Sequence, residues 1–289
     1  MKKSSLWVAM SLLFVAALTS CGPKSPFPGY KPNGNGLYYK QITAGKGEQL
    51  KDGDVIKVRL AYYINDSLLY TTDMLPEPAY DMVHESFFQG DLYDGFRMMH
   101  VGDSMSFMLN ADSVFNKQFH APEMPAFVTP GAFMRWEVAV DEAMTEEAFH
   151  AMREAQVAEQ QQASKDAFAA YLQENGIDAT PTETGLVYVC TKPGKGPKPN
   201  PNQTVKVHYT GKLLDGTVFD SSVERGEPFE FQLGIHQVIA GWDEGIAMMK
   251  KGEKGILYIP YELAYGPRQT GPIPAYSNLI FEVELIDFK

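Results

Sequence analysis

The sequence has 289 residues, with 36 acidic and 25 basic side chains, a formal net charge of -11 and a pI near 5.0. This acidic balance argues against nucleic-acid binding, because DNA- and RNA-binding surfaces need clustered Lys and Arg. Hydrophobic residues make up 44% of the chain, which is enough to form folded cores, and the length suggests about two domains.

The first twenty residues have the features of an export signal. Residues 1–3 are positively charged overall, and 6–18 are apolar but too few to span a bilayer comfortably. The sequence LTSC at 18–21 resembles the lipobox of bacterial lipoproteins, in which the signal is cut before the cysteine and the cysteine is lipidated. We therefore expect a signal peptide over 1–20 and a lipid on Cys21. The alternative is an ordinary secretory signal with an incidental cysteine.

The segment after Cys21 changes character twice. Residues 21–36 are rich in Pro, Gly, Lys and Asn, and we expect them to form a tether. Apolar and polar residues then alternate in short runs at 55–60, 104–109 and 134–140, and this period of two predicts strands. We place a first strand-rich domain over 37–141.

Residues 142–177 are expected to form a helical linker. The stretch 145–175 has no Gly or Pro and is rich in Ala, Glu and Gln, with Thr145 placed to cap its first turn. Such a helix is roughly 45 Å long. Its apolar residues are sparse in the middle, which favours a solvated connector. A dimer seam along this helix, and hence a homodimer, is the alternative that the pattern leaves open.

A second strand-rich domain is expected over 178–289. Cys190 lies in the apolar run 186–190 and is expected to be a small buried core residue rather than a reactive thiol. The histidines do not form a ligand cluster, so neither a metal ion nor another cofactor is predicted.

The two strand-rich regions resemble each other. Six matches keep their order along the chain, and they pair 36–39 with 185–188, 45–47 with 194–196, 55–58 with 204–207, 94–99 with 244–249, 102–103 with 252–253, and 136–138 with 281–283. Ordered matches with a slowly drifting offset are typical of duplicated domains. The chain is therefore predicted to hold two copies of one fold.

The second copy carries the motifs VHYTG, DGTVFDSS, VIAGWDEG, AYGPR and LIFEVEL in that order. Together they resemble the FKBP family of peptidyl-prolyl cis/trans isomerases, in particular its bacterial envelope members. The resemblance implies an α+β fold, an antiparallel sheet of five or six strands wrapped around a short helix at 243–249. Two such domains would be joined by the long helix. It also implies that proline-containing polypeptides are the substrates and macrolides are further ligands.

The resemblance also implies which residues form the pocket. Trp242 would be the floor under the substrate proline ring, Tyr265 and the Ile239 N–H would donate to substrate carbonyls, and Arg225 would pair with Asp220. The residues assigned to catalysis are Tyr209, Asp220, Trp242 and Tyr265, and those assigned to substrate binding are Phe219, Arg225, Phe229, Val238, Ile239, Ile273 and Phe281. The loop at 266–274 is shorter than in the best-known eukaryotic members and lacks their histidine.

The first copy lacks these residues. The repeat aligns Leu60 with Tyr209, Thr71 with Asp220, Leu92 with Trp242 and Phe115 with Tyr265. We therefore expect the second copy alone to be an isomerase that assists the folding of exported proteins at the periplasmic face of the cell envelope, the outer membrane being favoured over the inner. The alternative is an envelope chaperone or scaffold that binds polypeptide and has incidental isomerase activity.

Overall fold

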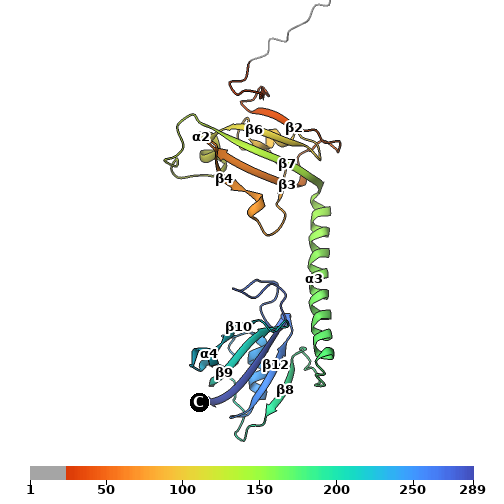
Figure 1. The fold of residues 1–289 in the computed structure, drawn as a ribbon, viewed down its shortest axis with the longest axis vertical. Helices are drawn as coiled ribbons and strands as arrows, with labels where there is room; N and C mark the ends of the chain where they lie inside the picture. The colour runs from red at the N-terminus through yellow and green to blue at the C-terminus, as the bar shows by residue number, and fades with distance from the viewer. Residues whose placement is uncertain (1–23) are drawn as a thin grey trace, which may run out of the picture. The chain divides into compact units, whose positions relative to one another are not determined.

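The computed structural model describes residues 24–289 (Figure 1). Two compact units divide the chain: a first unit that ends at Ala151 and a second unit that comprises Met152–Lys289. None of the helices found in residues 24–289 is sufficiently long and apolar to cross a membrane. The predicted signal peptide and Cys21 lie outside the described residues.

The first unit is a seven-stranded antiparallel sheet with a short helix, α1 (Leu92–Phe96). Its strands are β1 (Lys31–Pro32), β2 (Tyr38–Thr43), β3 (Asp54–Ile64), β4 (Ser67–Thr71), β5 (Tyr80–Met82), β6 (Ser104–Asn110) and β7 (Phe133–Thr145). The order across the sheet is β1-β2-β6-β7-β3-β4, and β5 also pairs with β3. After β6 come the single turn α2 (Ala111–Ser113) and a π-helical turn over Val114–Gln118; a 3-10 turn over Thr72–Met74 follows β4.

The second unit is a six-stranded antiparallel sheet packed on the helix α5 (Ala240–Met248). Its strands are β8 (Val187–Lys192), β9 (Thr204–Leu213), β10 (Val218–Ser221), β11 (Phe229–Gln232), β12 (Lys254–Ile259) and β13 (Leu279–Phe288). The order is β10-β9-β13-β12-β8, and β11 also pairs with β9. The helical turn α4 (Ser222–Arg225) follows β10, and a 3-10 turn over Tyr261–Leu263 follows β12.

The two sheets have the same topology. Strands β2, β6, β7, β3 and β4 lie in the same order as β8, β12, β13, β9 and β10, and β5 and β11 occupy equivalent places. The register agrees as well, because Leu60 pairs with Val138 as Tyr209 pairs with Val283. The predicted duplication of one α+β fold is therefore confirmed at the level of strand pairing.

Helix α5 lies unusually close to strand β12. A Cβ atom placed on Gly241 would be 2.5 Å from Ile259, and one placed on Gly245 would be 2.5 Å from Leu257. Only glycine permits this approach. The helix begins at Ala240, three residues before the predicted Asp243, because the Ile239 carbonyl already accepts hydrogen bonds from the N–H groups of Trp242 and Asp243.

The long helix α3 (Glu146–Glu174) begins directly after β7, so the predicted domain boundary at 141 falls inside that strand. Thr145 Oγ1 accepts a hydrogen bond from Ala148 N at 3.2 Å, as expected for the cap. Towards its C-terminal end, Phe168 packs with Val187, Tyr258 and Ile280 on the sheet face opposite α5. The C-terminal half of the helix therefore belongs to the second unit.

The part of the expected tether that the structure describes packs on the first unit. Phe27 makes edge-to-face contacts with Tyr38 and Phe133 at ring-centroid distances of 5.1 Å and 4.9 Å, and Tyr30 Oη lies 2.7 Å from Ser106 Oγ. Residues 31–32 then pair with β2. The two aromatic residues among the Pro and Gly residues account for this docking, since their burial offsets the loss of chain entropy.

Cys190 is exposed, so the expectation of a buried core residue is wrong. It lies near the end of the edge strand β8, where only one neighbouring strand covers it. Strand periodicity predicted which residues face the core side, but not where along the strand the core ends.

Candidate active site

A cavity of about 210 Å³ opens in the second unit beside the start of α5. It is lined by Tyr209, Phe219, Asp220, Phe229, Gln237, Val238, Ile239, Trp242, Tyr265 and Phe281. These residues come from β9, β10, β11, β13, the segment 237–242 and the loop after β12. The cavity thus brings together every residue of the predicted pocket except Arg225 and Ile273.

Trp242 is the centre of an aromatic cluster. Its indole meets the rings of Tyr209 and Phe281 edge to face, at 4.9 Å and 5.1 Å with interplanar angles of 82°. Phe231 and Phe229 lie 5.7 Å and 6.1 Å from it. These neighbours fix the orientation of the indole, which is only 4% exposed.

The space above the indole exists because residue 211 is glycine. A Cβ atom at Gly211 would lie 2.6 Å from the Phe219 ring and 2.7 Å from the Phe281 ring. Phe219 and Phe281 can therefore meet at 5.6 Å over the strand, where they form one wall of the cavity. A side chain at this position would push these rings aside or occupy the cavity.

The polar rim of the cavity is a three-residue cluster. Asp220 accepts hydrogen bonds from the Tyr209 hydroxyl and from Arg225 Nη1, and Arg225 Nη2 donates to Tyr209 Oη at 3.0 Å. Burial opposes ionisation of Asp220, but these two hydrogen bonds and the guanidinium charge outweigh burial and lower the pKa of Asp220. Asp220 is therefore a fixed carboxylate whose oxygens are already bonded, and it is poorly suited to accept a proton.

Several donors of the cavity-lining residues have no protein partner within residues 24–289, among them the buried Trp242 Nε1. Among the described residues, neither the Tyr265 hydroxyl nor the Ile239 N–H has a hydrogen-bond acceptor. Burial, and then the negative charge of Asp220, raises the pKa of Tyr265, so its hydroxyl keeps its proton at neutral pH. Tyr265 is 37% exposed, so a ligand can reach it.

The structure places three residues differently from the sequence expectation. Arg225 contacts the cavity only through Asp220 and Tyr209. Ile273 is 4% exposed and packs in the core of the second unit rather than against the cavity. Gln237 lines the cavity but was not predicted; its position immediately before Val238 and Ile239 was the available signal.

The equivalent place in the first unit is filled. Strand pairing matches Tyr62 with Gly211, and the Tyr62 ring lies 4.5 Å from Trp136 and 5.4 Å from Tyr70. Phe115, which the sequence repeat aligns with Tyr265, is 8% exposed. Side chains thus occupy the volume that is open in the second unit.

Strand pairing also corrects the predicted equivalent of Asp220. Tyr70 pairs with Tyr62 as Asp220 pairs with Gly211, so the residue at the Asp220 position is Tyr70 and not Thr71. The next two positions agree with this alignment. Thr72 Oγ1 accepts from Leu60 N at 3.1 Å, just as Ser222 Oγ accepts from Tyr209 N at 2.8 Å.

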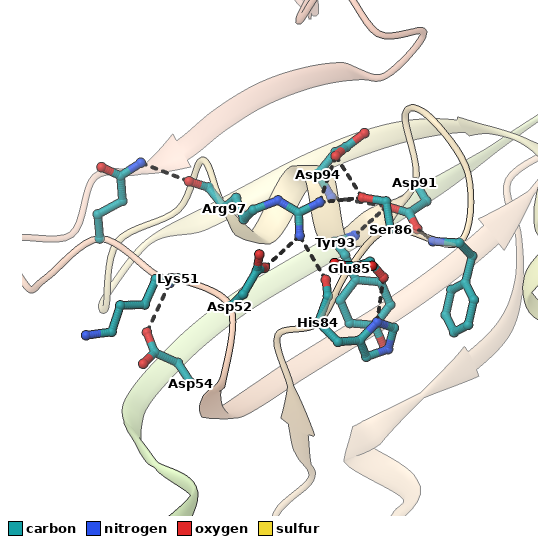
Figure 2. A network of polar contacts seen from close by, with 12 residues as sticks. Lys51, Asp52, Asp54, His84, Glu85, Ser86, Asp91, Tyr93, Asp94 and Arg97 are labelled. Atoms are coloured by element: carbon teal, nitrogen blue, oxygen red, sulfur yellow. Dashed lines mark hydrogen bonds and ion pairs between the residues drawn. The ribbon is translucent and has the colours of Figure 1, made fainter.

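A polar network holds α1 of the first unit (Figure 2). Arg97 donates to Asp52 at 2.9 Å, to the His84 carbonyl at 2.8 Å and to Asp94 at 2.9 Å. Asp91 is fully buried and accepts from the N–H groups of Phe87, Tyr93 and Asp94. The network fixes the segment 84–91, whose counterpart in the second unit, 234–241, contributes to the cavity wall.

The Asp220 cluster predicts a pH-dependent contribution to stability. The pKa of Asp220 is lower in the folded than in the unfolded protein, so ionised Asp220 stabilises the folded state. This stabilisation is complete above the unfolded-state pKa of about 3.9, and it is lost as the pH falls through the lower folded-state pKa. We expect Asp220→Asn to lower the unfolding temperature of the second unit at pH 7 and to have little effect at pH 2, as measured by calorimetry of the full chain. Asp178→Asn, at an exposed position, is the matched control. An equal destabilisation at both pH values would contradict the assignment.

Comparison with known proteins agrees with the geometry. Residues 196–286 match the model of the family described as FKBP-type peptidyl-prolyl cis-trans isomerase. The chain is 48% identical over 128 residues to the FKBP-type peptidyl-prolyl cis-trans isomerase FkpA of Aeromonas hydrophila, a match that covers 44% of this chain and 46% of that protein. It is 52% identical over 106 residues to FK506-binding protein 1 of Dictyostelium discoideum, covering 36% of this chain and 99% of the relative.

Among solved structures, the crystal structure of FkpA from Escherichia coli shares 40% sequence identity and has a TM-score of 0.43. That match covers 50% of this chain and 69% of the FkpA chain. The chain thus spans less than half the length of the Aeromonas relative but almost the whole of the Dictyostelium one. Through its second unit, the chain belongs to the FKBP-type peptidyl-prolyl cis-trans isomerase family.

Proposed function

We propose that the second unit catalyses cis/trans isomerisation of peptide bonds before proline in polypeptides exported to the bacterial envelope. The observation that carries this proposal is the cavity itself. It has an apolar floor and walls around Trp242, a protonated Tyr265 hydroxyl, the Ile239 N–H at its edge and a fixed carboxylate. The family membership of this unit supports the same activity.

The reaction requires rotation about a bond and no transfer of atoms. The barrier is about 18–20 kcal/mol, because the C–N bond has partial double-bond character. At the twisted transition state conjugation is lost and the dipole of the amide shrinks. An apolar cavity therefore disfavours the planar, more polar ground state relative to the twisted one.

The donors at the cavity edge complete the proposed mechanism. With the proline ring on Trp242, the Tyr265 hydroxyl and the Ile239 N–H would bind the substrate carbonyls that flank the rotating bond. Hydrogen bonds that are best formed in the twisted geometry lower the barrier. Asp220 would hold Tyr209 and Arg225 in place at the rim and set the local negative potential.

This proposal predicts that the full chain accelerates isomerisation of a proline-containing tetrapeptide. We expect Tyr265→Phe to lower kcat/KM on the order of tenfold, the effect of losing one neutral hydrogen bond in the transition state. Tyr70→Phe, which removes a tyrosine hydroxyl from the first unit, is the control and should leave the rate unchanged. A full chain that leaves the peptide at its uncatalysed rate would sink the proposed activity, whereas equal rates for wild type and Tyr265→Phe would remove Tyr265 from the mechanism.

The lipobox-like sequence at 18–21 supports a lipid anchor on Cys21 at the cell envelope. Phe27 already packs on the first unit, so only residues 22–26 separate it from Cys21, and the Cα atoms of Cys21 and Phe27 are at most about 22 Å apart. We infer that a lipidated chain holds its first unit close to the membrane surface. Incorporation of labelled fatty acid that persists in Cys21→Ser would exclude the anchor. The periplasmic face of the outer membrane remains our preferred location.

The proposed substrates are proline-containing segments of exported proteins. Macrolide binding is proposed as well, because the Dictyostelium relative is named for FK506 binding and the pocket residues lie together in the second unit. A homodimer through α3 remains a hypothesis that analytical ultracentrifugation can decide; the exposed middle of the helix does not favour it.

A second function, polypeptide binding by the first unit, is favoured by one observation. The first unit exposes several large apolar side chains, among them Leu68 (46%), Met74 (76%), Phe119 (38%) and Phe127 (54%). Contiguous exposed apolar surface marks sites that contact other chains, and Phe119 and Phe127 both pack against Phe115. Binding of unfolded clients there would make the protein a chaperone whose isomerase pocket acts on chains held nearby.

This second function predicts that the full chain slows aggregation of a chemically denatured client protein. Met74→Ser combined with Phe127→Ser should weaken that effect, because it removes the two most exposed of these four side chains. Ile42→Ser, at an exposed apolar residue of β2, is the matched control. If the double variant protects the client as well as the wild type does, client binding at this surface is excluded.

A further inference from the structure

The loop that carries Tyr265 is tied to helix α3 by two buried polar residues outside the cavity. This loop, 261–276, leaves the end of β12 and returns to the start of β13. Ser164 of α3 is 8% exposed, and Asn278, directly before β13, is 5% exposed. Buried polar side chains of this kind are retained only where their hydrogen bonds are made.

Asn278 uses its whole amide group at this junction. Its Oδ1 accepts from Tyr261 N at 2.9 Å, which fixes the beginning of the loop. Its Nδ2 donates to the Ser164 carbonyl at 2.7 Å and to Ser164 Oγ at 2.9 Å. One side chain therefore links the first residue of the loop to the helix.

Ser164 links the helix to the other end of the loop. Its hydroxyl donates to the Tyr276 carbonyl at 2.8 Å, and the Tyr276 N–H donates to the Gly266 carbonyl at 2.8 Å. Gly266 is the neighbour of Tyr265 in the chain. The path from Ser164 to the residue beside Tyr265 thus consists of two hydrogen bonds joined through the backbone of Tyr276.

Further contacts reinforce the junction. The rings of Tyr261 and Tyr276 meet edge to face at 5.4 Å, and Lys165 Nζ lies 3.5 Å from a carboxylate oxygen of Glu262. The Gly266 N–H donates to the Tyr261 carbonyl at 3.0 Å. Both ends of the loop and the segment beside Tyr265 therefore form one hydrogen-bonded assembly with α3.

The first unit shows that the fold itself does not need this junction. At the corresponding strand ends, Ala111 N donates to the Ala132 carbonyl at 2.9 Å, so the backbone alone closes the same gap. Trp136 of the first unit corresponds to Phe281 of the second, so Phe133, three residues before Trp136, corresponds to Asn278. The Ser164–Asn278 link is therefore a feature of the unit that has an open cavity.

We propose that Ser164 and Asn278 are positioning residues for isomerisation. They hold the loop 261–276 so that the Tyr265 hydroxyl faces the cavity, and they make the isomerase pocket dependent on the long helix. This inference rests on the proposed function of the second unit. It adds that α3 is a working part of the catalytic unit as well as a connector.

The test uses the full chain with Ser164→Ala, Asn278→Ala and the control Gln160→Ala, which changes an exposed residue one turn earlier on α3. Hydrogen exchange over 261–276 reports on the loop whether or not the protein is active. Peptide isomerisation gives kcat and KM, and Tyr265→Phe is combined with each variant. Unfolding temperatures and circular dichroism establish that each variant is folded under the assay conditions.

We expect Ser164→Ala and Asn278→Ala to speed exchange in 261–276 at least several-fold, with Gln160→Ala unchanged. Ser164→Ala and Asn278→Ala should each lower kcat on the order of fivefold with little change in KM. Combined with Tyr265→Phe, neither should lower kcat further, because each acts through the Tyr265 hydroxyl that Tyr265→Phe removes. Unchanged exchange would overturn the proposal, and so would additive losses, since these indicate an effect that bypasses Tyr265. A wild-type chain without isomerase activity would refute the proposed function, while the exchange measurement would still decide whether the junction holds the loop.

Discussion

The site depends most on the close approach of helix α5 to strand β12. Gly241 and Gly245 let the helix backbone lie against Ile259 and Leu257, where any Cβ would clash. This contact fixes the distance between the first turn of α5 and the sheet. It thereby fixes the positions of Trp242 and of the N–H groups at the start of the helix. The aromatic residues of β9, β11 and β13 then pack around the indole and restrict its orientation. The cavity is the space left above that indole.

The two units separate what the fold requires from what the pocket requires. Strand order and register are the same in both, and Gly95 of the first unit meets Phe107 as Gly245 meets Leu257. The difference lies in a few side chains on one side of the sheet. Gly211 leaves the cavity open, whereas Tyr62 fills the equivalent space, where it stacks on Tyr70 and packs at a tilt against Trp136. One scaffold can therefore carry an open pocket or a solid core, depending on residues that do not alter its strand pairing.

Much of this arrangement could be predicted from the sequence, because the periodicity of the strands, the turn glycines and the ordered motifs are local features. The exceptions have identifiable physical causes. Tyr70 was missed as the equivalent of Asp220 because the hairpin between β9 and β10 is one residue longer than that between β3 and β4, a difference that only strand pairing reveals. Cys190 was misplaced because periodicity does not show where a core ends. The docking of Phe27 and the junction at Ser164 and Asn278 depend on contacts between residues far apart in the chain, for which the sequence carries no local signal.

We infer that the open space over Trp242 makes the second unit an isomerase. Nuclear magnetic resonance exchange spectroscopy on a proline peptide, with the full chain and with Gly211→Tyr, tests it most directly, because this substitution installs the residue that fills the equivalent space in the first unit. We predict faster cis/trans exchange with the wild-type chain and a return to the uncatalysed rate with Gly211→Tyr, while circular dichroism shows both proteins folded. Equal acceleration by the two folded proteins would show that isomerisation does not need the open space over Trp242.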